Sequence, residues 1–234
     1  MAKDPAAADY TFGIVGAGTM GRGIAQIMAA GGMDVLLFDT EAGVATDAGS
    51  FIERMLTRAA EKGNMTADEA QAAHARIHVP DALAEMAACD VVVEAIIEDL
   101  DIKRALFTDL EAIVADECIL ASNTSSLSIT AIAGGCARPG RIAGYHFFNP
   151  VPLLRVVEVV EGLKTEAGVA ETLARIARRA GHEPVRVRDT PGFLVNHAGR
   201  GPPTEGVRIV TEGITDFAGV DDLVRESGPG FPMG

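Results

Sequence analysis

The stretch "FGIVGAGTMG" restricts the fold of this chain more than any other part of its sequence. An apolar strand leads into Gly16, Gly18 and Gly21 in a G-x-G-x-x-G spacing, and a helical pattern follows directly. The first glycine permits a tight turn, the second lets the backbone approach a diphosphate, and the third lets the helix pack closely on the strand. The N–H groups at the start of the helix also favour an anion. We therefore predict that Gly16, Gly18, Thr19, Met20 and Gly21 bind a dinucleotide.

The residue that ends the next apolar stretch, "MDVLLFD", is Asp39. A carboxylate there can accept hydrogen bonds from the ribose hydroxyls of adenosine, and it would repel the 2′-phosphate of NADP. The following residues, "TEAG", supply no arginine that could receive such a phosphate. The predicted cofactor is therefore NAD. A purely structural glycine turn would explain the glycines but not the position of Asp39.

Short apolar stretches alternate with longer segments of helical period along the first half of the chain. We expect strands in "TFGIVG", "MDVLLFD", "CDVVVEAII" and "CILASN", and helices over 19–31, 41–62 and 99–116. A further helix follows Thr66, an N-cap residue whose capping box is closed by Glu69. This alternation predicts an α/β fold, a Rossmann-type doubly wound sheet that is mostly parallel and covered by helices on both faces.

The pattern changes in the second half of the chain. We expect the same sheet to continue, with antiparallel pairing as an option, through strands over 141–147, 155–160 and 184–188 and a helix over 166–180. Pro191 and the Gly/Pro cluster at 199–203 break regular structure, and a new helical pattern begins near Thr204. We therefore predict a nucleotide-binding domain over 1–190 and the start of an all-helical part over 191–234, which is too short for a core of its own.

Composition and charge argue against several other classes of protein. The 234 residues carry a formal net charge of −13. A protein that binds the phosphates of a nucleic acid needs a basic surface instead. The three cysteines are widely spaced, which fits reduced thiols better than a disulfide frame, and no metal spacing links them to the histidines. Neither "MAKDPAAADY" nor any later segment has the apolar length of a signal peptide or a membrane span. We expect a cytoplasmic protein with no nucleic-acid, membrane or metal partner.

Two titratable residues stand out in "GYHFFNPVPLLRVVEVV", where His146 ends one apolar stretch and Glu158 interrupts the next. A hairpin through the turn "NPVP" can bring the two side chains face to face. A carboxylate on one ring nitrogen fixes the tautomer of an imidazole and makes the other nitrogen a better base. We predict a working pair, with His146 as general base and Glu158 as the group that orients it. A buried structural ion pair is the alternative.

Five motifs in register, "GAGTMGRGIAQ", "VVEAIIED", "ASNTSSLSIT", "HFFNPV" and "PGFLVN", resemble the L-3-hydroxyacyl-CoA dehydrogenase family, including its 3-hydroxybutyryl-CoA enzymes. The resemblance runs from about Thr11 to Asn196. It implies an NAD-binding Rossmann domain, followed by a helical domain that completes the substrate cleft and forms a homodimer. It also implies the reversible oxidation of a 3-hydroxyacyl-CoA to the 3-ketoacyl-CoA with NAD, a reaction of β-oxidation in fatty acid metabolism.

The same resemblance assigns further site residues. Ser125 matches the residue that hydrogen-bonds the reacting oxygen of the substrate, and Asn196 matches an amide that helps to hold that region. Glu98 and Lys103 match cofactor-side positions, and Lys62 matches a basic residue presented to coenzyme A. Each residue has a plainer alternative, which is a cap for Ser125 and Asn196 and solvated surface charge for the other three.

The chain departs from the family after Asn196, where "HAGRGPPTEGVRIV" replaces a more apolar helical run. The glycines and prolines within 199–203 should shorten or kink the helix that carries this residue. The final "GFPMG" resembles a motif that the family has inside its helical domain, so we expect these 234 residues to hold only the first part of that domain.

Two rival functions share much of this pattern. One is a related NAD-dependent dehydrogenase of a free hydroxy or sugar acid, as in the L-gulonate dehydrogenase and lambda-crystallin branch, which would differ in how the acyl tail is bound. The other is a non-catalytic NAD-binding protein. The intact set of Ser125, His146, Glu158 and Asn196 argues against the second rival.

Overall fold

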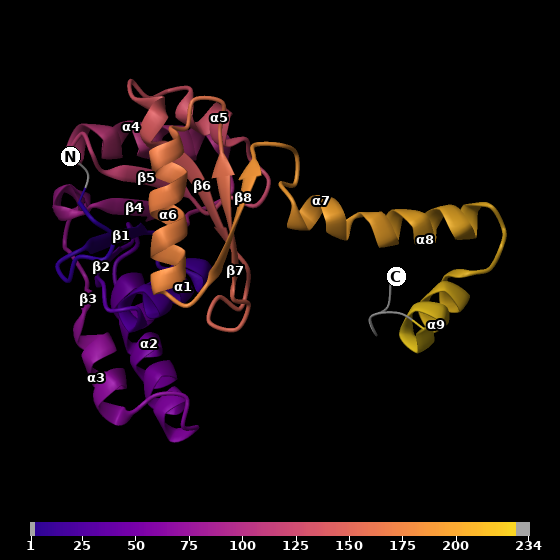
Figure 1. Cartoon of the computed structure of the whole chain (residues 1–234), viewed down its shortest axis with the longest axis horizontal. Coiled ribbons are helices and arrows are strands. Elements are labelled where there is room, and N and C mark those ends of the chain that lie inside the picture. The colour runs from indigo at the N-terminus through magenta and orange to yellow at the C-terminus, as the bar shows by residue number, and fades with distance from the viewer. Residues whose placement is uncertain (1–2, 228–234) are drawn as a thin grey trace. The chain divides into compact units, whose positions relative to one another are not determined.

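The structure is a computed structural model, and it describes residues 3–227 of the chain. The chain forms two compact units, Met1–Thr190 and Pro191–Gly234, each with its own internal packing (Figure 1).

An eight-stranded sheet forms the centre of the first unit, in the order β3-β2-β1-β4-β5-β6-β7-β8. Every neighbouring pair is parallel except β6 and β7, which run antiparallel. The strands are β1 (Thr11–Val15), β2 (Asp34–Phe38), β3 (Ile77–His78), β4 (Val91–Glu94), β5 (Ile119–Ser122), β6 (Ile142–Phe147), β7 (Val156–Glu161) and β8 (Glu183–Arg188). The predicted fold class, a mostly parallel doubly wound Rossmann-type sheet, is confirmed.

Helices connect and cover these strands. They are α1 (Thr19–Ala30), α2 (Val44–Glu61), α3 (Ala67–Ala75), α4 (Leu100–Ile113), α5 (Ile129–Ala133) and α6 (Ala167–Arg179), with 3₁₀ turns at Leu83–Ala88 and Pro139–Arg141. The predicted long helices are present with ends shifted by a few residues. The sequence did not predict α5, the short strand β3 or the 3₁₀ turns.

The core follows the two-residue period of the strands. Alternate residues such as Phe12 and Ile14 of β1 and Val157 and Val159 of β7 are buried in one cluster with α1 and α6. Figure 1 shows α6 crossing one face of the sheet. The other face is closely packed, since a Cβ on Gly13 would lie 2.8 Å from the Cys89 sulfur. Both faces of the sheet are therefore buried, as near-continuous apolar strands require.

The predicted capping box at the start of α3 is present. The Thr66 hydroxyl accepts a hydrogen bond from the backbone N–H of Glu69 at 3.1 Å, and the Glu69 carboxylate accepts one from the Thr66 N–H at 2.7 Å. Each side chain thus satisfies one N–H group that the first helical turn leaves without a partner.

Helix α5 is anchored by a carboxylate from far along the chain. Asp189, which directly follows β8, accepts hydrogen bonds from the Ser128 hydroxyl at 2.7 Å and from the N–H groups of Ile129 at 3.1 Å and Thr130 at 2.8 Å. Partial burial opposes ionisation of this carboxyl, but the hydrogen bonds from Thr130 and Ser128 outweigh it and hold the pKa of Asp189 below its usual value. The negative charge also suits the N-terminal end of a helix.

The second unit consists of helices in its described part: α7 (Val195–Gly199), α8 (Gly201–Thr211) and α9 (Phe217–Ser227). Helix α7, which carries Asn196, is short, as the glycines and prolines after it predicted. The expectation that 199–203 breaks regular structure is wrong in part, because α8 begins at Gly201 with its prolines in the first turn. Proline is tolerated there because the first-turn N–H groups have no helical acceptor. The "GFPMG" motif lies outside the described residues.

Among the described residues, no helix has the length and apolar character needed to span a membrane.

Candidate active site

The glycine loop joins β1 to α1 at the point where the strand order of the sheet reverses. Gly16 has a φ of 101°, and a Cβ on it would lie 2.6 Å from the Ala95 carbonyl oxygen. A Cβ on Gly21 would lie 1.7 Å from the Gly16 carbonyl oxygen, whereas a Cβ on Gly18 would meet nothing within 4 Å. Gly16 and Gly21 therefore allow close backbone packing, and Gly18 leaves an open surface.

This open surface fits a diphosphate. Gly18 is the N-cap of α1 and supplies no side-chain hydrogen bond to the first turn, where Thr19 and Met20 lie. Exposed N–H groups at a helix N-terminus and the positive end of the helix dipole bind anions. Ligands of doubly wound sheets also bind at the carboxyl ends of the strands where the order reverses. The loop can hold the diphosphate of NAD on both grounds.

Asp39 lies directly after β2 and braces the glycine loop. One carboxylate oxygen, Oδ2, accepts a hydrogen bond from the Ala17 N–H at 2.8 Å, and Oδ1 accepts one from the Glu41 N–H at 3.0 Å. Each carboxylate oxygen has a second lone pair, which can accept a hydrogen bond from a ribose hydroxyl. The geometry thus brings the predicted ribose acceptor to the loop that is predicted to hold the diphosphate.

His146 and Glu158 are direct cross-strand neighbours in the antiparallel pair of β6 and β7. The Nδ1 atom of His146 lies 2.6 Å from Oε2 of Glu158, and the two residues are 5 % and 0 % exposed. A carboxylate at this distance accepts a hydrogen bond from the Nδ1–H group and so fixes the neutral imidazole in the tautomer whose Nε2 is basic. The predicted hairpin is therefore present, and it creates the geometry that a general base requires.

A cavity of about 360 Å³ connects this pair to the cofactor loop. Its lining includes Met20 from the glycine loop, His146 from β6, Ser125 from the loop after β5, and Glu98 and Lys103 from the β4–α4 region. Five of the predicted site residues thus meet at one cavity. This arrangement places a base and a hydroxyl group beside the loop that is predicted to bind the dinucleotide.

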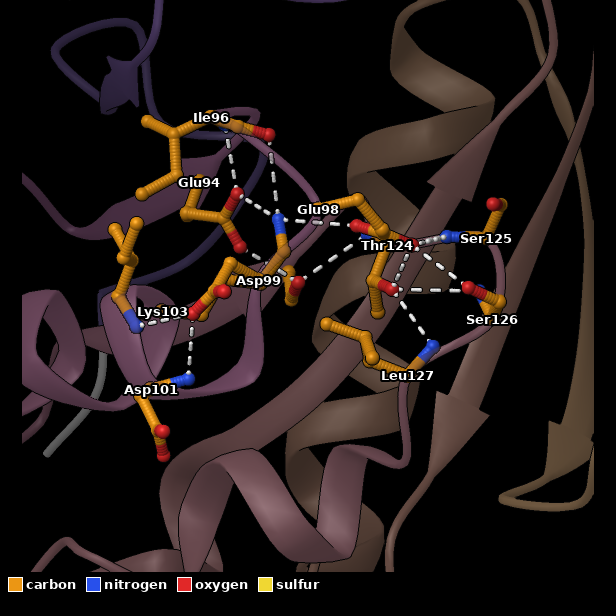
Figure 2. Close-up of polar contacts among 12 residues, drawn as sticks. Glu94, Ile96, Glu98, Asp99, Asp101, Lys103, Thr124, Ser125, Ser126 and Leu127 are labelled. Carbon is orange, nitrogen blue, oxygen red and sulfur yellow. Dashed lines mark hydrogen bonds and ion pairs between the residues drawn. The ribbon is translucent and has the colours of Figure 1, made fainter.

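Below this cavity lies a buried ion pair between Glu94, the last residue of β4, and Lys103 in the first turn of α4 (Figure 2). The two residues are 0 % and 1 % exposed. Glu94 also accepts hydrogen bonds from the Ser122 hydroxyl and the Ile96 N–H, both at 2.7 Å. The alternative that Lys103 is a solvated surface charge is therefore wrong.

Glu98 connects the same lysine to the loop that carries Ser125. Its Oε2 lies 3.3 Å from the Lys103 ammonium, and its Oε1 accepts hydrogen bonds from the Thr124 hydroxyl at 2.6 Å and from the Ser125 N–H at 3.1 Å (Figure 2). Burial opposes ionisation of Glu98, but the Thr124 hydrogen bond and the Lys103 charge outweigh it and hold its pKa below the usual value. The ionised carboxylate of Glu98 therefore holds the loop that carries Ser125 in place.

Sequence reasoning missed three residues of this region. Glu94 was included in an apolar strand, although a carboxylate there is as unusual as the one at Glu158, and that signal could have identified it. Asn123 accepts a hydrogen bond from the Phe147 N–H at 2.9 Å and so ties the Ser125 loop to the strand of His146. Asn149 lines the cavity as well, next to Phe148, and only its proximity to His146 in sequence marked it.

Lys62 lies away from these groups, at a second cavity of about 670 Å³. It caps α2 and lines the cavity together with three arginines, Arg22, Arg58 and Arg155. The Arg22 guanidinium stacks over the Phe51 ring, with 3.9 Å between its carbon and the ring centroid. Four cationic side chains at one cavity, in a chain of net charge −13, make it a suitable site for a phosphorylated ligand.

Asn196 is half-buried on α7 of the second unit. Its predicted role at the reacting oxygen stays a prediction.

The cysteines do not offer a competing nucleophile. Burial raises the pKa of Cys118 to about 12 and that of Cys136 to about 11, so their thiolate forms are scarce at neutral pH. Among the described residues there is also no group of three histidine, cysteine, aspartate or glutamate side chains that could hold a metal ion.

The chain matches a known protein family over residues 11–190. The family model is described as the NAD-binding domain of 3-hydroxyacyl-CoA dehydrogenase. The matched segment contains the glycine loop, Asp39, Ser125 and the His146–Glu158 pair.

Several known proteins are similar to the chain over almost its whole length. It is 41 % identical to the 3-hydroxyadipyl-CoA dehydrogenase of Escherichia coli, over 96 % of this chain and 47 % of that protein. It is 40 % identical to a probable 3-hydroxybutyryl-CoA dehydrogenase of Deinococcus radiodurans, over 95 % of this chain and 80 % of that protein. A crystal structure of an E. coli 3-hydroxybutyryl-CoA dehydrogenase superposes with a TM-score of 0.89 at 39 % identity, covering 93 % of this chain and 46 % of that one. The chain thus spans about half the length of the E. coli relatives.

Proposed function

Because the chain belongs to the 3-hydroxyacyl-CoA dehydrogenase family and contains its NAD-binding domain, we propose that the whole protein oxidises a 3-hydroxyacyl-CoA to the 3-ketoacyl-CoA with NAD, reversibly. The observation that carries the proposal is the 2.6 Å contact between His146 and Glu158 at a cavity that Ser125 also lines. This contact provides an oriented base where the β-hydroxyl group would lie.

Proton transfer is the task of the histidine. Nε2 of His146 takes the hydroxyl proton of the substrate, and the carboxylate of Glu158 stabilises the imidazolium that forms. NAD, when bound, accepts the hydride that leaves C3. Ser125 donates a hydrogen bond to the oxygen that becomes the ketone, and Asn196 is proposed to help hold the same oxygen. The proton therefore ends on His146, and the electron pair of the former O–H bond completes the C=O bond as C3 gives up its hydride, for which bound NAD would be the acceptor.

The cationic cavity at Lys62 favours a thioester of coenzyme A over a free hydroxy acid. A free acid carries one small carboxylate, whereas coenzyme A carries several phosphate charges that four cationic side chains can neutralise. We assign the phosphorylated end of coenzyme A to this cavity. No feature of the site favours the free-acid rival in the same way.

A substrate panel tests the proposal. The readout is NADH absorbance, with 3-hydroxybutyryl-CoA and 3-hydroxyadipyl-CoA compared with the corresponding free 3-hydroxy acids. We expect turnover of a thioester and none of a free acid. Turnover of the free acids alone would support the sugar-acid or hydroxy-acid branch, and NADH binding without turnover of any substrate would support a non-catalytic protein.

The exposed surface of the second unit and the cysteines bear on assembly and location. The second unit exposes large apolar side chains, Val207, Ile214, Phe217 and Leu223. We propose that the protein forms a homodimer through this helical unit, which sedimentation equilibrium would detect. We also propose a cytoplasmic location, with which the three free cysteines are consistent.

A further inference from the structure

Glu94 is a buried carboxylate that the proposed reaction does not use. Ala95 and Ile96, which follow it, line the 360 Å³ cavity, whereas Glu94 itself is fully buried beneath the lining. Both of its oxygens are held, Oε2 by the Ser122 hydroxyl and Oε1 by the Ile96 N–H and the Lys103 ammonium. Its position is therefore fixed, and it acts on the cavity only through its charge and through Lys103.

Stability alone does not explain this ion pair. Desolvation makes buried ion pairs costly, and apolar residues of similar size often replace them without loss. Lys103 also lies in the first turn of α4, where the helix dipole disfavours a cation. An arrangement that costs stability at the floor of a ligand cavity points to a functional reason.

The charges beside the cavity are unequal. Glu94 and Glu98 supply two negative charges and Lys103 supplies one positive charge, all within one network (Figure 2). The network is thus anionic by one unit. A nicotinamide ring is cationic in the oxidised cofactor and neutral in the reduced one, so a nearby negative charge attracts the oxidised form selectively.

We propose that Glu94 is a positioning residue that sets the preference of the site for oxidised over reduced cofactor, by making the Lys103 network net negative. The inference rests on the proposed function, because it needs the nicotinamide in the cavity beside His146. The negative charge of Glu94 also offsets the positive charge of Lys103, which by itself would favour binding of the neutral, reduced ring.

The test compares dissociation constants of NAD⁺ and NADH for a series of charge variants at one pH. Glu94→Gln keeps the size of the side chain and removes its charge, so the preference for NAD⁺ should fall about tenfold. Lys103→Met should raise the preference by a similar factor. The double variant carries the same net charge as the wild type, so its preference should return to the wild-type value even if both affinities are lower.

Ser122→Ala is the matched control, because it removes a hydrogen bond to Glu94 and leaves every charge in place. Its preference should equal that of the wild type. Thermal unfolding shows which variants are folded, and if Glu94→Gln is not, Lys103→Met and the double variant decide the question. Equal changes in both dissociation constants, or a shift of the two single variants in the same direction, would overturn the inference. A wild-type chain that binds neither NAD⁺ nor NADH would instead overturn the proposed function.

Discussion

At the scale of single residues, Asp39 combines two tasks that one substitution can separate. Its Oδ2 holds the glycine loop through the Ala17 N–H, and its charge is predicted to exclude the 2′-phosphate of NADP. Asp39→Asn keeps an oxygen for the loop and removes the charge. We expect the preference for NADH over NADPH to fall about tenfold, because one unit of repulsion is lost.

Fluorescence titration of both reduced cofactors measures this preference. Glu41→Gln is the matched control, since only its backbone N–H contacts Asp39 and its preference should not change. Equal affinity of the unmutated chain for NADH and NADPH would contradict the assignment of NAD specificity to Asp39.

The His146–Glu158 pair makes a second prediction at this scale. His146→Ala should lower turnover by roughly 10² to 10⁴, the usual contribution of a general base. Glu158→Gln should lower turnover less and alter its pH dependence, because an amide cannot stabilise an imidazolium as a carboxylate does. NADH affinity should stay near normal in both variants.

Initial rates across the neutral pH range, together with NADH titrations, check this prediction. Glu161→Gln is the control, because Glu161 lies on the same strand but pairs with Arg186 at 3.0 Å instead of a histidine. Wild-type rates for either variant of the pair would leave only a structural role for it.

At the scale of elements, Asp189 ties the end of β8 to the start of α5 and makes stability depend on pH. Its pKa is lower in the folded chain than the ordinary value of 3.8, so its contribution is complete above that value and is lost as the pH falls through the folded pKa. Asp189→Asn should lower the free energy of unfolding at pH 7 by about 1–3 kcal/mol, the worth of hydrogen bonds to a charged group. The difference from wild type should shrink as the pH falls below about 4.

Urea unfolding at several pH values measures the effect. Glu183→Gln, at the exposed start of the same strand, serves as the control and should change little. A destabilisation by Asp189→Asn that stays constant down to pH 3 would contradict the electrostatic explanation.

The elements that sequence patterns predicted are those whose own residues determine them. Strands such as β1 and β4 are apolar runs, and α3 has a local capping box, so local chemistry suffices. The missed elements depend on distant partners: β3 exists through its pairing with Val35 and Leu36, and α5 is anchored by Asp189. The prolines of α8 were misinterpreted because their effect depends on whether they fall in the first turn.

The candidate site divides in the same way. The glycine loop, Asp39 and the His146–Glu158 hairpin could be predicted, because motif spacing and one acid in an apolar strand identify them. The buried state of Lys103 could not be predicted, since it depends on a carboxylate at the end of another element. The same holds for Asn123, whose contact with β6 arises only when the strands align.

At the scale of the whole molecule, the predicted cofactor residues all lie in the unit Met1–Thr190, whereas Asn196 lies in the other unit. A chain shortened to residues 1–190 should therefore bind NADH with nearly normal affinity and have lost most of its turnover. In the 234-residue chain, Asn196→Ala should lower turnover and leave NADH affinity near normal. His197→Ala, on the same helix, is the matched control. NADH titration and thioester turnover measure the two properties, and full turnover by residues 1–190 would rule out a catalytic role for the second unit.

The connection between β6 and β7 separates residues that can vary from residues that the strand register holds in place. The register of the two strands alone aligns His146 with Glu158, while the loop between them supplies lining to both cavities, including Asn149 to each and Arg155 to the larger. Loops tolerate substitution and changes of length far better than the strands that they join. Substitutions or changes of length in this loop can therefore reshape the lining of both cavities, while the strand register keeps His146 aligned with Glu158.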